Sequence, residues 1–586
     1  MIQLLKRMRR KEWLMAGLCA LFVLGQIYFD LRLPEYMSNL TVLIKTPGST
    51  MADIWMTGLE MLGCTLASAV LSILGGYLAS QVAAGFSYTI REGVFGQVAD
   101  FGQKEMQRFS VPSLINRTTN DITQIQMLVA MGLQITVKAP VMAVWAIIKT
   151  VRKSWTLSAI TAGFTVALLG LMVVVIIVIL PRVKRVQKLT DNINRISREN
   201  LTGINVVHAY NAEEYQAEKF EQASEELKST QLFNQRALAL LMPTVSFAMN
   251  ALSLTIFWVG ASIVNSVAVT DMAARISTFG DVVVFSTYAT YVIMSIMMMV
   301  MIIMLLPSAQ VSAGRINEVL ETKIDLQEGD QDTAPERGTV EFRNVSFRYP
   351  SSGKNALENV SFKVNKGETI AFIGATGSGK TTLVSLAARF YDATAGQVLV
   401  DGRDVKDYTF DALYGRIGYV TQKAVLFAGD IRENVLFGES NAPQTDENVK
   451  NAIALAQASE FVDKLPEGIQ APITQGGSNV SGGQKQRLSI ARALARRPEI
   501  LIFDDSFSAL DYRTDAMLRK GLAEQLSETT CMIVAQRIGT IRHADKIIVL
   551  DEGKAVGIGT HEELIKNCLV YREIAMSQLS TEELDA

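Results

Sequence analysis

The chain has 586 residues, of which 49% are hydrophobic and 19% are charged, and this length calls for several compact units rather than one core. Lys and Arg (56) nearly balance Asp and Glu (58), for a formal net charge of -2; no nucleic acid partner is expected, because nothing indicates a strongly basic surface. The four cysteines have no CxxC or Cys/His metal spacing, which predicts buried or free thiols. They are Cys19, Cys64, Cys531 and Cys568.

Long apolar runs dominate the first half of the chain. Six of them are long enough to cross a bilayer, since a transmembrane helix needs roughly 20 apolar residues and satisfies its own backbone. They lie at residues 13–29, 55–81, 126–148, 155–180, 243–265 and 282–306. The sequence therefore predicts an α-helical six-span membrane domain over residues 1–307, a linker over 308–337 and a water-soluble domain over 338–586.

Basic residues precede the first span, at Lys6, Arg7, Arg9, Arg10 and Lys11. The positive-inside rule places them in the cytoplasm, and six spans return the C-terminal domain to the same side of the cell membrane. Lys149, Arg152 and Lys153 oppose this pattern, because they lie in a short loop that the topology places outside. Residues 30–34 offer no small-residue cleavage site, so the first span is expected to stay as an anchor rather than be removed as a signal peptide.

Two long polar connections, at residues 87–125 and 182–243, have a helical periodicity and are expected to extend the spans into the cytoplasm. Glu60 is an ionisable group at membrane depth and a candidate cavity residue. The sixth span is rich in methionine, which suits a surface that repacks around apolar ligands but equally suits ordinary bundle core. These methionines are Met294, Met297, Met298, Met299, Met301 and Met304.

The strongest motif of the second half is Gly374-Ala-Thr-Gly-Ser-Gly-Lys380-Thr381, a match to G-x-x-x-x-G-K-[ST]. A β-rich run at residues 369–373 precedes it and a helical pattern at 382–390 follows, as the motif requires. The loop amides can close around phosphates, Lys380 can reach the terminal phosphates and Thr381 can bind Mg²⁺. A second buried strand, at residues 500–504, ends in Asp504, the expected Mg²⁺ ligand beside the first strand. Together these motifs predict an α/β P-loop domain that binds ATP and Mg²⁺.

The kind of P-loop domain follows from Val480-Ser481-Gly482-Gly483-Gln484, which precedes Lys485-Gln-Arg487. This segment resembles the signature sequence of ABC transporters, and the order of membrane domain first and ATPase second resembles exporter half-transporters. Residues 474–479 and 503–508 are similar to those of bacterial heterodimeric multidrug exporters. The resemblance implies a dimer in which each ATP lies between one subunit's P-loop and the other subunit's signature.

The resemblance also assigns roles to single residues. Tyr349 looks like the aromatic that stacks on adenine, Gln422 like the glutamine that links Mg²⁺ to the coupling helices, and residues 508–511 like the loop that crosses to the opposite subunit. The metal ligands are expected to be Thr381, Gln422 and Asp504. The expected nucleotide contacts are Tyr349, Gly374, Thr376, Gly377, Ser378, Gly379, Lys380, Thr381, Thr382 and Asp511, with Ser481, Gly482, Gly483 and Gln484 acting on the partner's ATP.

Two residues depart from the family pattern. Asp505 stands where active members have a glutamate that orients the attacking water, and Gln536 stands where they have a histidine that contacts the γ-phosphate. The first is one methylene shorter, and the second cannot carry a proton or a positive charge near neutral pH. Both changes affect the same step, which predicts a degenerate site that holds ATP and hydrolyses it slowly.

The most specific function that the sequence supports is ATP-driven export of amphiphilic small molecules, including drugs, across the cytoplasmic membrane. The chain would act as an ATPase subunit of a heterodimer, with most hydrolysis at the site that a second half-transporter with consensus catalytic residues completes. A homodimeric lipid or peptide exporter remains open, as does an ATP-binding membrane regulator without transport. Membrane lipid is the other expected partner.

Overall fold

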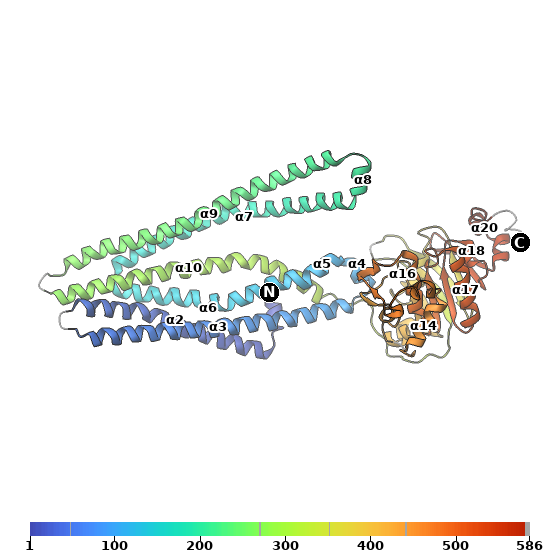
Figure 1. Ribbon diagram of the computed structural model, residues 1–586, viewed down its shortest axis with the longest axis horizontal. Helices are drawn as coiled ribbons and strands as arrows, with labels where there is room; N and C mark the ends of the chain where they lie inside the picture. The colour runs from blue at the N-terminus through green and yellow to red at the C-terminus, as the bar shows by residue number, and fades with distance from the viewer. Residues whose placement is uncertain (47–48, 269–270, 351, 440–441, 580–586) are drawn as a thin grey trace. The chain divides into compact units, whose positions relative to one another are not determined.

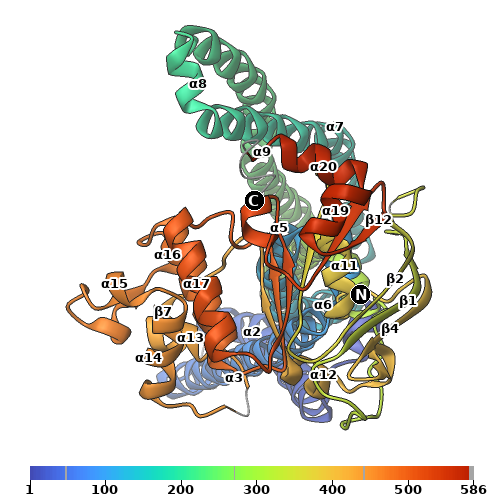
Figure 2. The same cartoon turned by 90° about the vertical axis from the view of Figure 1, so that its right-hand side faces the viewer.

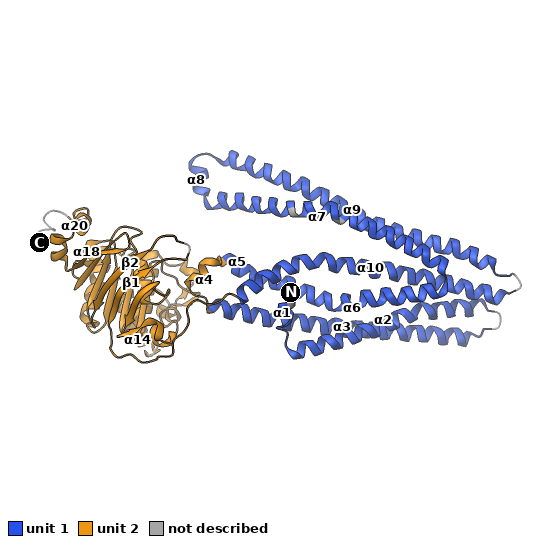
Figure 3. Cartoon of the chain, turned by 180° about the vertical axis from the view of Figure 1, so that it is seen from behind, with its two compact units in different colours: residues 1–99, 112–321 blue, residues 100–111, 322–586 orange. Residues whose placement is uncertain are grey.

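The computed structural model describes residues 1–46, 49–268, 271–350, 352–439 and 442–579. It divides into two compact units, one of Met1–Ala99 and Pro112–Glu321 and the other of Asp100–Val111 and Thr322–Ala586 (Figure 3). The first is referred to as the membrane unit and the second as the ATP unit. The chain thus passes between the units three times, and residues 100–111 fold with the ATP unit although they lie between two predicted spans.

Six long helices form the membrane unit, and within the described residues six helices are long and apolar enough to cross a membrane. Each contains one predicted span, which confirms the six-span architecture. Their lengths exceed a bilayer core, since the 49 residues of α3 extend about 70 Å at 1.5 Å per residue. They are α2 (Arg10–Lys45), α3 (Met51–Ala99), α6 (Ile122–Lys153), α7 (Trp155–Thr202), α9 (Glu213–Ser266) and α10 (Met272–Leu320).

The predicted helical connections are confirmed, with breaks. Residues 87–125 contain the end of α3, then α4 (Gln103–Arg108), α5 (Val111–Asn116), the π-helix η1 (Arg117–Asp121) and the start of α6. Residues 182–243 contain the ends of α7 and α9, which α8 (Ile204–Ala209) joins. Figure 1 shows α7 and α9 running alongside one another and diverging from the other four long helices toward α8.

Ion pairs neutralise all three lysines of α6. Lys149 lies 2.6 Å from Glu35 of α2, and Lys153 pairs with Asp281 of α10. Deeper in the span, Lys138 lies 3.3 Å from Asp30 of α2, with both side chains 22% exposed. Charges in the membrane are tolerated when they pair inside a bundle. The pairing therefore makes Lys149 and Lys153 weak indicators of orientation, because their charges are compensated within the bundle.

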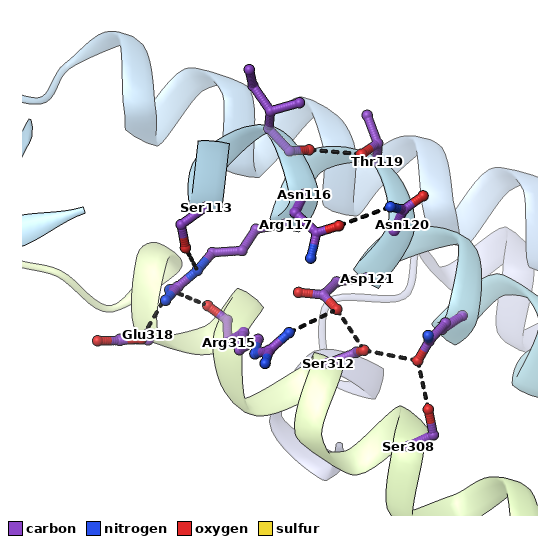
Figure 4. Close-up of polar contacts among 12 residues, drawn as sticks. Ser113, Asn116, Arg117, Thr119, Asn120, Asp121, Ser308, Ser312, Arg315 and Glu318 are labelled. Carbon is purple, nitrogen blue, oxygen red and sulfur yellow. Dashed lines mark hydrogen bonds and ion pairs between the residues drawn. The ribbon is translucent and has the colours of Figure 1, made fainter. Parts of the chain in front are cut away.

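A polar brace connects η1 to the last third of α10 (Figure 4). Arg117 donates to the carbonyl of Arg315 at 2.8 Å and pairs with Glu318 at 2.9 Å. The Asp121 carboxylate, 3% exposed, accepts a 2.7 Å hydrogen bond from Ser312 and lies 3.8 Å from the Arg315 guanidinium. A π-helix is rare and occurs mostly as a single turn within α-helices. Here it is stabilised by side chains that meet α10.

We expect Asp121→Ala to destabilise the membrane unit. The substitution removes the carboxylate that accepts from the buried Ser312 hydroxyl and faces the half-exposed Arg315 guanidinium. Ser312 keeps Gln124 as a second acceptor at 3.1 Å, so the expected loss is that of one ordinary hydrogen bond, about 0.5–1.5 kcal/mol. Asp121→Asn keeps an acceptor for Ser312 and should lose less stability than Asp121→Ala. Thermal unfolding of the purified full chain in detergent measures the effect, with Asn120→Ala as the control because Asn120 is exposed beside it. An unfolding midpoint equal to that of the control would show that the brace carries no stability.

Two main sheets build the ATP unit, apart from a short two-stranded sheet of β7 (Gly429–Asp430) and β8 (Pro472–Ile473). The larger has the order β12-β11-β3-β10-β9-β6, and only its edge strand β12 is antiparallel. The smaller is antiparallel, with the order β2-β1-β4-β5. The bounds of the larger sheet are β3 (Thr369–Ile373), β6 (Ile417–Val420), β9 (Ile500–Asp504), β10 (Thr530–Val534), β11 (Lys546–Asp551) and β12 (Lys554–Gly559). Those of the smaller are β1 (Val340–Phe347), β2 (Leu357–Val364), β4 (Ala395–Val400) and β5 (Arg403–Asp404).

Each face of the parallel sheet packs on its own core. One face packs with the antiparallel sheet and α11 (Lys380–Ala387), and the other with α13 (Ile431–Val435), α14 (Asp446–Leu455), α16 (Gly482–Ala495) and α17 (Tyr512–Gln525). Figure 2 shows β1, β2 and β4 on one side of the parallel strands and these helices on the other. The P-loop strand and the Asp504 strand are not neighbours, contrary to the sequence expectation, because β10 lies between β3 and β9.

The predicted linker at residues 308–337 has two different parts. Its first residues belong to α10, which continues to Leu320. Residues beyond Glu321 lie on the ATP unit, where the amides of Gly329 and Gln331 donate 3.0 Å hydrogen bonds to the carbonyls of Tyr408 and Asp407. A Cβ at Gly329 would lie 2.2 Å from the Asp407 carbonyl oxygen, so only glycine fits there.

Candidate functional site

The loop between β3 and α11 is shaped by glycine. Gly379 has φ +101°, a conformation that residues with a Cβ rarely adopt, and a Cβ there would lie 2.7 Å from the carbonyl oxygen of Ala356. At Gly374 the added Cβ would lie 2.0 Å from the Leu550 carbonyl oxygen. The backbone of the loop is therefore packed closely against its neighbours, and the loop leads directly into the N-terminus of α11, where an anion is favoured.

Lys380 is buried, with 9% exposure, and its ammonium donates 2.8 Å hydrogen bonds to the carbonyls of Gly374 and Ala375. Burial lowers the pKa of Lys380, while the charges of Asp505 and Asp504 oppose that shift. The loop thus holds a positive charge among its own peptide groups, in the place where the motif directs phosphate oxygens.

A hydroxyl and a carboxylate meet at the other side of the loop. Thr381 donates a 2.8 Å hydrogen bond from Oγ1 to Oδ1 of Asp504, and Tyr419 donates from its hydroxyl to Oδ2 at 3.2 Å. Burial raises the pKa of Asp504, and these two hydrogen bonds oppose the rise. Oxygen ligands of this kind suit Mg²⁺, so Thr381 and Asp504 could hold the ion. Tyr419, on β6, is a supporting residue that no sequence motif singled out.

Asp505 lies directly after β9 in a left-handed conformation, with φ +48° and 6% exposure. Gln536 donates a 2.7 Å hydrogen bond from Nε2 to Oδ2 of Asp505, and Gln422 donates to the same oxygen at 3.2 Å. The other oxygen, Oδ1, is buried and has no hydrogen-bond partner among the residues that the structure describes. Burial raises the pKa of Asp505, and the two amides oppose the rise. The two residues that depart from the family pattern are therefore direct partners.

A cleft of about 330 Å³ lies at this edge of the sheet. Tyr349 borders it, where its hydroxyl pairs with Thr382 at 2.9 Å and its ring packs edge-on against Phe347 and Tyr391. All other lining residues except Ala356 and Val534 are ones that the sequence assigned to nucleotide or catalysis. The cleft is lined by Tyr349, Ala356, Thr376, Gly377, Gly379, Lys380, Thr381, Thr382, Gln422, Asp505, Val534 and Gln536.

The signature residues lie outside this cleft. Ser481 is the N-cap of α16 and forms a capping box with Gln484, through bonds of 2.8 Å and 3.3 Å. Ser481 and Gly482 are exposed, and a Cβ at Gly483 would touch the Ala509 carbonyl oxygen at 3.4 Å. Asp511 is likewise exposed and caps α17. These groups present a helix N-terminus to the surface of the ATP unit rather than to the chain's own P-loop.

Two further residues tie α16 to the segments on either side of Gln422. Gln486 donates to the carbonyl of Thr421 at 3.2 Å, and Arg492 donates to the carbonyls of Val425 and Asn434 at 2.9 Å and 2.8 Å. Sequence reasoning missed both, because neither belongs to a recognised motif. They connect the helix that begins with the signature to the glutamine of the ATP cleft.

Comparison with known proteins agrees with this geometry. Residues 357–508 match the family model described as ABC transporter, and residues 21–297 match the one described as ABC transporter transmembrane region. An uncharacterized ABC transporter ATP-binding protein of Bacillus subtilis is 35% identical over 574 residues, 97% of each chain. The chain belongs to the ABC transporter family. With one membrane domain and one ATP-binding domain, it is an exporter-type half-transporter and a multi-pass membrane protein, and its domain implies ATPase activity.

Other relatives extend the comparison. An uncharacterized ABC transporter ATP-binding protein of Mycobacterium tuberculosis is 37% identical over 534 residues, 90% of each chain. An ATP-dependent lipid A-core flippase of Pseudomonas aeruginosa is 28% identical over 499 residues, 84% of this chain and 80% of that protein. The solved structure of a bacterial Atm1-family ABC exporter with ATP bound superposes with a TM-score of 0.78 at 23% identity, covering 97% of this chain and 99% of that one. That likeness shows the exporter fold.

We expect Tyr419→Phe to raise the Mg²⁺ concentration that ATP binding requires. The variant removes a donor to Asp504, and loss of a residue that supports a metal ligand costs about tenfold in metal affinity. The measurement is ATP binding by the full transporter at a series of Mg²⁺ concentrations. Tyr414→Phe is the matched control, because that ring stacks on Phe410 instead. Equal Mg²⁺ dependence of the two variants would contradict a supporting role for Tyr419.

Proposed function

We propose that this half-transporter is the degenerate-site subunit of a heterodimeric exporter that moves amphiphilic small molecules, including drugs, across the cytoplasmic membrane. The observation that carries the proposal is the pairing of Asp505 with Gln536, at the two positions where the family pattern has glutamate and histidine. The chain binds ATP with Mg²⁺ at its own P-loop and hydrolyses it slowly, while most turnover takes place at the site that the partner completes.

The chemistry of the cleft supports slow hydrolysis. Phosphoryl transfer depends on orientation and electrostatics, and misplacing a positioning group by about 1 Å can cost on the order of 10²-fold in rate. Asp505 is one methylene shorter than glutamate, and one of its oxygens already accepts from Gln422 and Gln536. Gln536 is neutral, so it adds no positive charge toward a γ-phosphate. ATP is therefore bound by complete phosphate contacts but attacked inefficiently.

The signature supports the second half of the proposal. Ser481 and Gly482 are exposed at the start of α16 and lie outside the chain's own cleft. Free amides at a helix N-terminus suit the phosphate of an ATP that another subunit carries. This chain thus completes the partner's site with an intact signature, and the partner supplies the glutamate and the histidine. In this proposal Tyr349 stacks on adenine, and Asp511 belongs to the loop that crosses to the opposite subunit.

Export of an amphiphile is supported by the membrane unit. Met294, Met299, Met301 and Met304 are exposed in the single chain, as is Glu60. Exposed methionines suit the apolar body of a ligand, and a carboxylate at membrane depth suits a polar or cationic group. Both termini lie in the cytoplasm, since the basic residues before α2 follow the positive-inside rule.

Homodimeric lipid export is the second candidate, and one observation favours it. The ATP-dependent lipid A-core flippases of Aromatoleum aromaticum and Pseudomonas aeruginosa are 30% and 28% identical to this chain. A peptide exporter and an ATP-binding regulator without transport are further alternatives. The homodimer works when this chain is expressed alone, whereas a regulator binds nucleotide and moves no substrate.

We expect the double substitution Asp505→Glu with Gln536→His to raise ATP turnover of the assembled exporter. It restores the longer carboxylate and an imidazole, and the gain should approach the ~10²-fold that misplacement costs at this site. The measurement is ATPase activity in inside-out vesicles that contain this chain with the product of its genetic neighbour, together with dye transport.

Two controls separate the alternatives. Lys380→Ala in this chain should abolish ATP binding at its own cleft and leave the residues of the partner's site intact. Glu60→Gln leaves the ATP site unchanged, so an effect of this variant on dye transport would indicate contact with substrate. Vigorous transport-coupled ATPase activity of this chain alone would overturn the heterodimer. Unchanged turnover after the double substitution would overturn the slow site.

A further inference from the structure

The C-terminal segment of the chain contacts the cleft through one side chain. Helix α20 (Leu569–Met576) packs into the core of the ATP unit, where Tyr571 and Ala575 are fully buried. Two residues after the helix, the Gln578 amide reaches the loop that carries Gln536. Figure 1 shows α20 beside α18 (Ile538–Ile541), the short helix that follows this loop.

Gln578 binds the loop from both of its polar atoms. Its Nε2 donates a 2.8 Å hydrogen bond to the carbonyl of Gln536, and its Oε1 accepts a 2.9 Å hydrogen bond from the amide of Ile538. The side chain thus pairs with the backbone on both sides of Arg537. The Gln578 side chain is exposed, and its two hydrogen bonds together restrain the loop, because both must be lost before the backbone can turn.

The restrained loop carries Gln536, whose side chain in turn holds the Asp505 carboxylate. Gln536 donates from its side chain to Oδ2 of Asp505, while Oδ1 has no partner among the described residues. A carboxylate held by one oxygen presents the other in a defined direction. Rotation of Gln536 would free Asp505 to turn, since Gln422 alone, at 3.2 Å, would remain.

We propose that Gln578 is a positioning residue of the ATP site, through which the C-terminal segment orients Gln536 and thereby Asp505. Nothing in the sequence motifs assigns a role to this residue. The inference rests on the proposed role of Asp505 and Gln536 in hydrolysis, but not on the identity of the partner subunit or of the substrate. Gln578 touches neither Asp505 nor the P-loop directly, so its effect requires the Gln536 side chain.

The test is single-turnover hydrolysis by this chain reconstituted in lipid nanodiscs with the product of its genetic neighbour, whose own P-loop lysine is substituted so that only this chain's site turns over. Protein is in excess over γ-labelled ATP and Mg²⁺. We expect Gln578→Ala to slow phosphate release by about tenfold, since a fraction of an ångström at a positioning group costs less than the 10²-fold of a full one. ATP affinity, measured with EDTA present, should change less than twofold because the P-loop is untouched. Gln578→Glu should slow phosphate release as well, because a carboxylate cannot donate a hydrogen bond to the Gln536 carbonyl.

A double-mutant comparison decides whether Gln578 acts through Gln536. In a Gln536→Ala background, Gln578→Ala should slow phosphate release no further, since residues that act as a unit are not additive. Ser577→Ala is the matched control, because Ser577 is the exposed neighbour and its Oγ only caps Ile574. An unchanged or faster rate for Gln578→Ala, an equal slowing in both backgrounds, or an equal loss of ATP affinity would each overturn the proposal.

Hydrogen exchange gives a second reading that does not depend on hydrolysis. In the wild-type full chain, ATP with Mg²⁺ should slow amide exchange in residues 569–579, and Gln536→Ala should remove that protection. Protection that persists in Gln536→Ala would show that the C-terminal segment does not communicate with the ATP site through Gln536, and would overturn the proposal. The proposed slow ATP site and the proposed role of Gln578 are contradicted by different results. Fast turnover by the chain alone would contradict slow hydrolysis at its site, but the comparison of Gln578 variants could still be made.

Discussion

The ATP unit depends on the arrangement of parallel strands, which brings their carboxyl ends to one edge of a sheet. Val534 of β10 pairs with Phe372 of β3 on one side and with Asp504 of β9 on the other. Asp504 is one of these partners and Asp505 follows it, while the P-loop begins two residues beyond Phe372 and Gln536 lies two residues beyond Val534. Register alone therefore gathers a lysine, a hydroxyl and two carboxylates in one place, and their opposite charges offset the cost of burying each.

The two departures from the family pattern form one structural unit. β6 and β10 flank β9, and Gln422 and Gln536 each lie two residues beyond their strand. Both amides consequently approach Asp505 from opposite sides and donate to the same oxygen. The Asp505 carboxylate therefore lies between two neutral donors, and the residue at one departing position is hydrogen-bonded to the residue at the other. This arrangement also leaves Oδ1 of Asp505 as the atom with chemistry still available.

Features carried by contiguous sequence could be predicted, and those set by tertiary register could not. The six spans and the P-loop are local patterns of hydropathy and glycine, and the structure has both. The roles of Tyr419 and Gln578 and the position of β10 between β3 and β9 depend on the pairing of distant segments, so no sequence motif predicts them. The pairing of Lys138 with Asp30 is of the same kind, because 108 residues separate the two charges in the sequence. The association of residues 100–111 with the ATP unit was hidden for another reason, since they continue a helical pattern that begins in the membrane unit.

Mechanical coupling has a physical basis in how the chain passes between its units. It crosses after Ala99, after Val111 and after Glu321, and the brace lies within ten residues of the last two crossings. Arg117 and Asp121 bind α10 there through Arg315, Ser312 and Glu318. Two of the three covalent connections are thus fastened to one another where they enter the membrane unit. The brace therefore couples these two connections to each other, and α6 and α10 also share the Lys153–Asp281 ion pair at their far ends.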